Sequence, residues 1–140
     1  MRTLERFLYV QNRTHEQVVE EIRNCKKISH WMWYTFPQIQ GLGESDYSVF
    51  YAIDDLEEAK RYLEHNILGA RLKKLSNELL KLETNNPEEI FGKLDSLKLK
   101  SSMTLFDYID KNDVFEYVLE KFYGGEKDEK TIQILEKSYK

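Results

Sequence analysis

Residues 26–43 read KKISHWMWYTFPQIQGLG, and this stretch interrupts a chain that otherwise follows helical patterns. It holds both tryptophans, one of the two prolines and two of the six glycines. Pro37 disfavours a helical residue before it and lacks a backbone donor, so a helical turn across the aromatic residues ends there. Gly41 and Gly43 tolerate positive φ angles, which indicates a loop. We therefore expect an irregular aromatic segment packed among regular helices.

The residues before this stretch predict two helices with a short break between them. Thr3–Val10 carries apolar residues at helical spacing, and the polar residues 11–13 follow as the break. Thr14 and Gln17 have the spacing of a capping box, which predicts a second helix reaching Cys25. Each helix has one apolar side, so each is expected to cover a core.

The residues after the stretch predict the remaining helices. The clearest runs from Ile67 to about Glu83, where leucines alternate spacings of four and three (Leu68, Leu72, Leu75, Leu79 and Leu82). Asn86 and Pro87 are typical of a helix start, and Gly124 of a helix end. We count about seven helical segments and no pair of alternating strands, so the 140 residues are expected to form one compact all-α domain.

Several shorter helices also have readable ends. Ser45 is suited to cap a helix, and Asp54 with Glu57 forms a second capping-box pattern. Gly92 should close the helix that begins at Pro87. The next segment fits a helix from Asp95 onward, although Leu97 and Leu99 alternate with lysines and so also allow a local strand.

The composition favours a soluble cytoplasmic protein. The chain is 41% hydrophobic, which is enough for one core, and its net charge is only −4. No global field therefore draws it to nucleic acid or to an anionic membrane, and we expect neither as a partner. No apolar run approaches the roughly 18 residues of a membrane helix, and no signal-peptide cleavage site follows the first residues. The single cysteine excludes an internal disulfide.

No motif in the chain names a reaction. It lacks a phosphate-binding P-loop, a dinucleotide fingerprint, a nucleophile elbow and any Cys or His pair at metal-ligand spacing, so we expect no cofactor and no metal site. His30 is the best polar candidate, because it directly precedes the aromatic run and imidazole titrates near neutral pH. The alternative is a histidine whose ring nitrogens are satisfied in a packed corner.

A second stretch, residues 98–106, is also left unexplained by packing patterns. It places two lysines beside three hydroxyl groups, and Lys98 and Ser102 share a face if the segment is helical. Such a face can hold an anion, or it can be no more than a solvated helix surface. We predict that the two stretches meet in a pocket where His30 and Lys98 face the same cavity as catalytic candidates, with eight ligand-binding candidates around them: Trp31, Trp33, Gln38, Gly41, Gly43, Ser101, Ser102 and Thr104.

These same stretches resemble a known family. Ser29–Trp33, Phe36–Gln38 and Gly41–Gly43, together with Leu97–Leu99 and Ser101–Phe106, are similar to domain-of-unknown-function family 1810, small bacterial proteins sometimes mislabelled calpastatin. The resemblance extends from about Leu4 to Leu135 and implies a single all-helical domain without supplying a reaction. The chain departs from the family pattern at Asn66, where proline is usual after histidine. It also lacks the disordered composition of a calpain inhibitor.

Two functions of different classes follow. The leading one is a pocket for a nucleotide or nucleotide-derived sugar phosphate, because aromatic side chains stack on a flat ring while lysines and backbone donors hold an anion. If it is catalytic, His30 would act as acid and base in a hydrolysis that Lys98 assists. The alternative is a protein-interaction module with an exposed aromatic patch and no catalysis. The sequence leaves the oligomeric state open.

Overall fold

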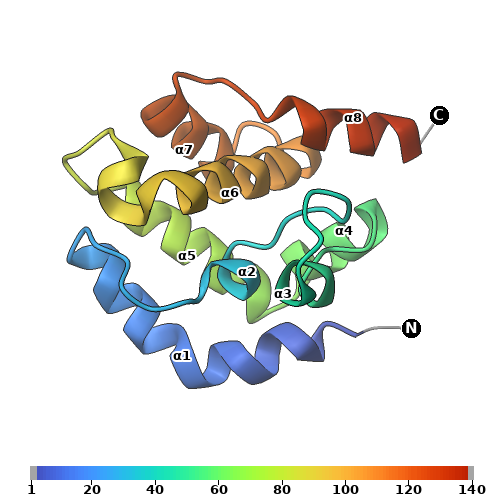
Figure 1. The fold of residues 1–140 in the computed structure, drawn as a ribbon, viewed down its shortest axis with the longest axis horizontal. Helices are drawn as coiled ribbons and strands as arrows, with labels where there is room; N and C mark the ends of the chain where they lie inside the picture. Colours follow the sequence, from blue (N-terminus) through green and yellow to red (C-terminus); the bar gives the residue numbers. More distant parts are fainter. Residues whose placement is uncertain (1–2, 139–140) are drawn as a thin grey trace.

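The computed structural model describes residues 3–138, and these form eight helices in a single compact domain (Figure 1). The helices are α1 (Glu5–Arg23), α2 (Met32–Thr35), α3 (Asp46–Phe50), α4 (Leu56–Glu64), α5 (Leu68–Leu80), α6 (Pro87–Ile109), α7 (Val114–Tyr123) and α8 (Glu129–Ser138). Strand pairing in this part of the chain is limited to one isolated parallel bridge, between Ile39 and Ile53. The expected all-α class is confirmed.

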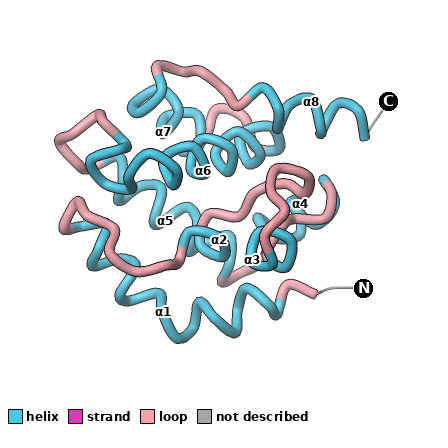
Figure 2. Tube along the Cα trace, viewed as in Figure 1, coloured by secondary structure: helices cyan, strands magenta, loops and turns pink. Residues whose placement is uncertain are grey.

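Helix α5 lies at the centre of the arrangement. It packs against α1, α4 and α7, while α6 packs against α2, α4, α7 and α8 (Figure 1). The leucine pattern that predicts α5 is explained by this position, because Leu68, Leu72, Leu75 and Leu79 are all buried. Figure 2 shows the loops that join α1 to α2 and α2 to α3, and Phe36, Pro37 and Ile39 of the second loop are buried in the fold.

Helix α1 corrects one prediction. Residues 11–13 do not break the chain, and a single helix runs from Glu5 to Arg23. Thr14 does not cap a new helix, since its hydroxyl donates to the Val10 carbonyl one turn back (2.9 Å). The reason is tertiary: Gln11 is buried, and its amide donates to the Tyr34 carbonyl and the Tyr62 hydroxyl. A polar residue with remote partners can therefore lie on the buried side of a helix.

Most helix ends are set locally, as predicted. Ser45 caps α3, Asn86 and Pro87 begin α6, and Gly124 ends α7 in the left-handed conformation. Gly92 has a φ of 79° and kinks α6, which separates a short first part from the long second part. The capping box of α4 lies one residue later than predicted, with Asp55 as the N-cap.

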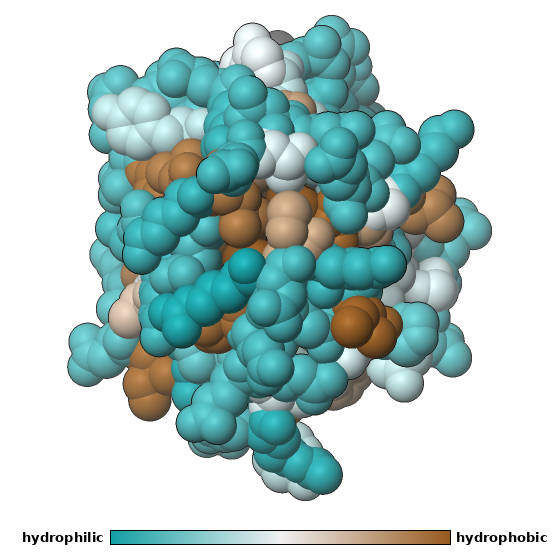
Figure 3. Space-filling model, turned by 90° about the vertical axis from the view of Figure 1, so that its left-hand side faces the viewer, coloured by the Kyte–Doolittle hydropathy of each residue, from teal (hydrophilic) through white to brown (hydrophobic). Residues whose placement is uncertain are grey.

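Charged and polar side chains cover most of the face shown in Figure 3, with apolar groups visible between them. No helix within residues 3–138 is long and apolar enough to cross a membrane.

Candidate functional site

The second part of α6 forms one wall of a surface cavity. Leu99, Met103 and Phe106 recur at helical spacing and are fully buried, so they fix which side of the helix faces the core. Lys98 and Ser101 are three residues apart and lie together on the flank beside that buried side. The segment is thus a helix and not the strand that its alternating lysines also allow.

The opposite wall comes from the segment between α2 and α4. The Ile53 N–H donates to the Gln38 carbonyl (2.8 Å), and the Gln40 N–H donates to the Ile53 carbonyl (2.9 Å). These two bonds tie the chain just before the Gly41–Gly43 loop to the segment around Ile53. A Cβ at position 43 would lie 2.9 Å from the side chain of Ser48, so glycine is what allows the loop to approach α3 this closely.

A cavity of about 220 Å³ lies between these walls. The start of α8 closes one side of it, through Asp128 and Lys130. Its lining combines aromatic, cationic, hydroxyl and backbone groups: Trp33, Gln38, Ile39, Gly41, Leu42, Gly43, Ser48, Tyr51, Ala52, Leu97, Lys98, Ser101, Asp128 and Lys130. A larger hollow of about 410 Å³ shares Ile39 and Gly41 with this cavity and has no lysine or arginine in its lining.

Lys98 is held in place by an aromatic ring and a carboxylate. Its Nζ lies 3.9 Å from the centroid of the Trp33 ring and 3.0 Å from Asp95 Oδ1. Asp95 Oδ2 also pairs with Lys27 Nζ at 2.9 Å. Burial raises the pKa of Asp95, but the hydrogen bonds from Lys27 and Lys98 outweigh it, so the pKa lies below its usual value. Asp95 is therefore a permanent counter-charge shared by two lysines.

Asp128 is held on the third side by three hydrogen-bond donors. Its Oδ2 accepts from the Ser101 hydroxyl (3.1 Å), from the Thr131 N–H (3.1 Å) and from the Thr131 hydroxyl. Its own N–H donates to Thr104 Oγ1 at 2.9 Å. The carboxylate thus caps α8, ties it to α6 and borders the cavity at the same time.

Six of the ten predicted site residues line this cavity, from two stretches that are remote in sequence. They are Trp33, Gln38, Gly41, Gly43, Lys98 and Ser101. His30 and Lys98 do not share it as predicted: His30 is exposed and is absent from the lining. The loop around His30 is anchored by its neighbours Ile28, Ser29 and Trp31, and this leaves the imidazole outside.

Trp31 belongs to the core and not to the cavity wall. Only 1% of it is exposed, and its ring packs near Phe36 and Phe91. Its indole Nε1 donates to Glu21 Oε1 at 2.8 Å. Ser102 and Thr104 are likewise fully buried. Thr104 still borders the site indirectly, because its hydroxyl positions Asp128.

Glu21 is the anchor of the whole aromatic stretch, and sequence reasoning missed it. Its carboxylate accepts from the N–H groups of Ile28 and Ser29, from the Ser29 hydroxyl, from Trp31 and from Gln17. Burial by itself would raise the pKa of Glu21, but these hydrogen bonds outweigh it and bring the pKa to about 2. An acid on the apolar side of a predicted helix is the signal that points to such an anchor.

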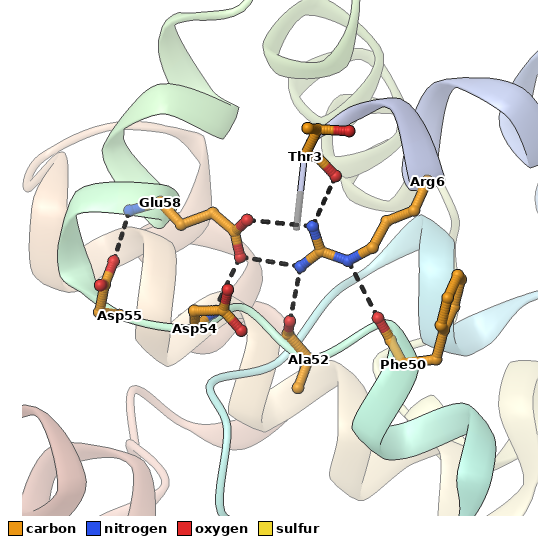
Figure 4. Close-up of polar contacts among 7 residues, drawn as sticks. All are labelled: Thr3, Arg6, Phe50, Ala52, Asp54, Asp55 and Glu58. Carbon is orange, nitrogen blue, oxygen red and sulfur yellow. Dashed lines mark hydrogen bonds and ion pairs between the residues drawn. The ribbon is translucent and has the colours of Figure 1, made fainter. Parts of the chain in front are cut away.

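Arg6 anchors the cavity wall formed by the segment between α2 and α4, as Glu21 anchors the aromatic stretch (Figure 4). Its guanidinium makes five hydrogen bonds, two of them to Glu58 and the others to the carbonyls of Thr3, Phe50 and Ala52. The Arg6 and Glu58 side chains are only 5% and 1% exposed. Ala52 lines the cavity, so this buried ion pair holds its wall on helix α1. It also explains the position of the α4 cap, since Glu58 accepts from the Asp54 N–H.

Asp128, Lys130 and Tyr51 are lining residues that the sequence did not single out. Asp128 follows the glycine pair 124–125 and is suited to cap the last helix, and a capping acid in that position carries no mark of a second task. Within the described residues, no group of three or more His, Cys, Asp or Glu side chains could hold a metal ion.

The chain is thus a small all-helical protein in which the aromatic stretch and helix α6 border a lysine-bearing surface cavity. The chain belongs to the family described as protein of unknown function (DUF1810), whose profile matches residues 1–135. A crystal structure of the conserved hypothetical protein Rv1873 from Mycobacterium tuberculosis is 46% identical with a TM-score of 0.92, over 95% of this chain and 96% of that one. No curated protein matches the chain.

Proposed function

We propose that this protein binds a small anionic ligand, a nucleotide or nucleotide-derived sugar phosphate, in the cavity between α6 and the Gly41–Gly43 loop. The observation that carries the proposal is the meeting of Lys98, Trp33 and the two glycines at one cavity, from stretches more than fifty residues apart. Packing alone does not require a lysine to be fixed by a tryptophan and an acid beside an open space.

The charges of the lining favour an anion. Two lysines, Lys98 and Lys130, and one carboxylate, Asp128, border the cavity. Lys98 is preorganised by its contacts with Trp33 and Asp95, so little side-chain entropy remains to be lost when an anion binds. The N–H groups of the glycine loop can approach a ligand closely because no Cβ stands in the way.

The aromatic residues supply a surface for a ring. Trp33 and Tyr51 both line the cavity and are half-buried, so part of each remains accessible. One face of Trp33 is taken by the Lys98 ammonium, which leaves the remainder of the indole for stacking, whereas the Tyr51 ring already packs against the rings of Tyr47 and Phe50. We place no hydrolytic step at this cavity, since His30 lies outside its lining.

A thermal-shift screen followed by titration calorimetry tests the proposal. The ligands are inorganic phosphate, ribose 5-phosphate, AMP, UMP and ADP-ribose, each at low ionic strength. We expect at least one sugar phosphate to raise the unfolding midpoint, and Lys98→Ala to weaken its binding by about tenfold. Lys93→Ala is the matched control, because Lys93 is exposed on the same helix and outside the lining. Absence of binding by the whole set would refute the proposal.

The alternative, an interaction module with an exposed aromatic patch, is supported by a different element from the one predicted. Trp31 is buried and Trp33 half-buried, whereas Tyr47 and Phe50 on α3 are 66% and 50% exposed. An interaction module predicts a concentration-dependent molecular mass that Tyr47→Ser lowers. Light scattering over a hundredfold concentration range measures this directly.

A further inference from the structure

The carboxylate of Asp128 has two oxygens with different surroundings. Oδ2 accepts three hydrogen bonds, from the Ser101 hydroxyl and from the N–H and hydroxyl of Thr131. Oδ1 accepts none from residues 3–138. Ser101 is 7% exposed and Thr131 is fully buried, so the donors that orient the carboxylate are themselves fixed by packing. Asp128 is therefore a preorganised acceptor with one oxygen still available.

This acceptor borders the same cavity as the two lysines. An anion alone gains from Lys98 and Lys130 but is repelled by Asp128. A ligand that carries hydroxyl groups next to its anion avoids this cost, because a hydroxyl can donate to Oδ1 in a charge-assisted hydrogen bond. The mixed lining thus fits a polyhydroxylated anion better than a bare one.

The size of the cavity leads to the same kind of ligand. Its volume of about 220 Å³ lies below the range of roughly 300 to 1,000 Å³ that is typical of pockets enclosing drug-sized molecules. A pentose phosphate is of suitable size, whereas a whole nucleotide would extend beyond the enclosed part. Trp33 lines the same cavity and is available to a group that projects from the sugar.

We propose that Asp128 is a specificity-determining residue that reads sugar hydroxyl groups, so that the enclosed part of the ligand is a pentose phosphate. This rests on the proposed function, since it assigns the contents of the same cavity. Oδ1 accepts from a hydroxyl of the sugar, and Lys98 and Lys130 hold the phosphate. The carboxylate discriminates against anions that have no hydroxyl groups.

The test compares three probes by titration calorimetry: ribose 5-phosphate, tetrahydrofurfuryl phosphate and inorganic phosphate. Tetrahydrofurfuryl phosphate keeps the ring and the phosphate and lacks every sugar hydroxyl. We expect the wild-type protein to bind ribose 5-phosphate about tenfold more tightly than this analogue, as for a hydrogen bond to a charged acceptor.

Asp128→Asn gives the decisive comparison. Asparagine caps helices as well as aspartate, and the three donors at Oδ2 fix its carbonyl there, so the amide nitrogen takes the place of Oδ1. The preference for ribose 5-phosphate should fall about tenfold, while inorganic phosphate should bind more tightly because a like charge has been removed. Glu129→Gln, the neighbouring exposed acid outside the lining, should change neither.

The outcomes separate this proposal from the function on which it rests. If the wild-type protein binds ribose 5-phosphate and its hydroxyl-free analogue equally well, the role of Asp128 is refuted and the anion site stands. If Asp128→Asn and Glu129→Gln have the same effect, the hydroxyl contact is refuted in favour of a general charge effect. If none of the three probes binds, the anion site fails and the reading of hydroxyl groups fails with it.

Discussion

Replacing Glu21 by glutamine should lower the free energy of unfolding at neutral pH. In acid the difference from the wild-type protein should disappear. Glu21 is only 6% exposed, and its carboxylate accepts five hydrogen bonds, four of them from the loop that carries the aromatic stretch. Glutamine keeps the shape of the side chain. Its amide nitrogen, however, would face groups that are themselves donors, and the charge that strengthens every bond would be gone.

The magnitude follows from the pKa of Glu21. In the folded protein it is about 2, against an ordinary value of 4.5. Each whole unit of difference corresponds to about 1.4 kcal/mol, which sets a limit of about 3 kcal/mol. Glu21 itself is buried, but Ile28, one of its donors, is 75% exposed, so solvent screening at this rim reduces the expected loss to about 2 kcal/mol. Because the folded pKa is depressed, this stabilisation is complete above pH 4.5 and disappears as the pH falls towards 2.

Urea denaturation of the wild-type protein and Glu21→Gln, followed by tryptophan fluorescence between pH 7 and pH 3, measures this difference directly. Taking the difference between the two proteins at each pH cancels the other carboxylates. Glu20→Gln is the matched control, an exposed acid one residue away on the same helix, and should leave the free energy of unfolding unchanged within about 0.5 kcal/mol. A difference that is equally large at pH 7 and pH 3 would refute the assignment of the carboxylate as the anchor.

Three further substitutions test the walls of the cavity and the packing of the frame. Arg6→Lys keeps the charge but loses the two-pronged bond to its partner carboxylate, so urea denaturation should show a loss of about 2 to 3 kcal/mol, and a loss below about 1 kcal/mol would contradict the role given to the pair. Gly43→Ala should weaken ligand binding in calorimetry, because its Cβ would lie 2.9 Å from the Ser48 side chain. Adding Ser48→Gly removes that side chain and should restore the affinity, and a double variant that binds as weakly as Gly43→Ala would contradict this explanation. Gly69→Ala should cost about 3 kcal/mol in thermal unfolding, since its Cβ would lie 2.0 Å from the Leu63 carbonyl oxygen, whereas Ala70→Gly should cost about 1 kcal/mol.

The helices are predictable from sequence wherever their ends are encoded locally. The Ser45 cap, Pro87 at a helix start and Gly124 at a helix end each act through their own backbone, so neighbouring residues suffice to read them. Helix α1 shows the opposite case. Its middle looks like a break because Gln11 is polar, and the partners that satisfy Gln11 lie 23 and 51 residues away.

The residues of the candidate site also divide into those that local sequence identifies and those that only tertiary contacts place there. Composition and spacing identify the two stretches that meet, because each departs from the pattern that packing imposes on its neighbours. They do not tell which residues of a stretch face the cavity. Lys98 and Ser101 enter it and Ser102 does not, since a single residue step turns a helix by about 100°. Asp128 joins them through a tertiary contact with Ser101 that no local pattern encodes.

The two tryptophans show how one stretch can serve both the core and the cavity. Glu21 draws the indole of Trp31 inward, and this fixes where α2 begins. Each helical residue turns the chain by about 100°, so the side chain of Trp33, two residues after Trp31, projects away from the core and contacts Lys98. A buried carboxylate on α1 thereby sets the orientation of an aromatic residue at the cavity, although the two never touch. One short helix therefore serves both purposes: Trp31 at its N-cap packs in the core, and Trp33 within it borders the cavity.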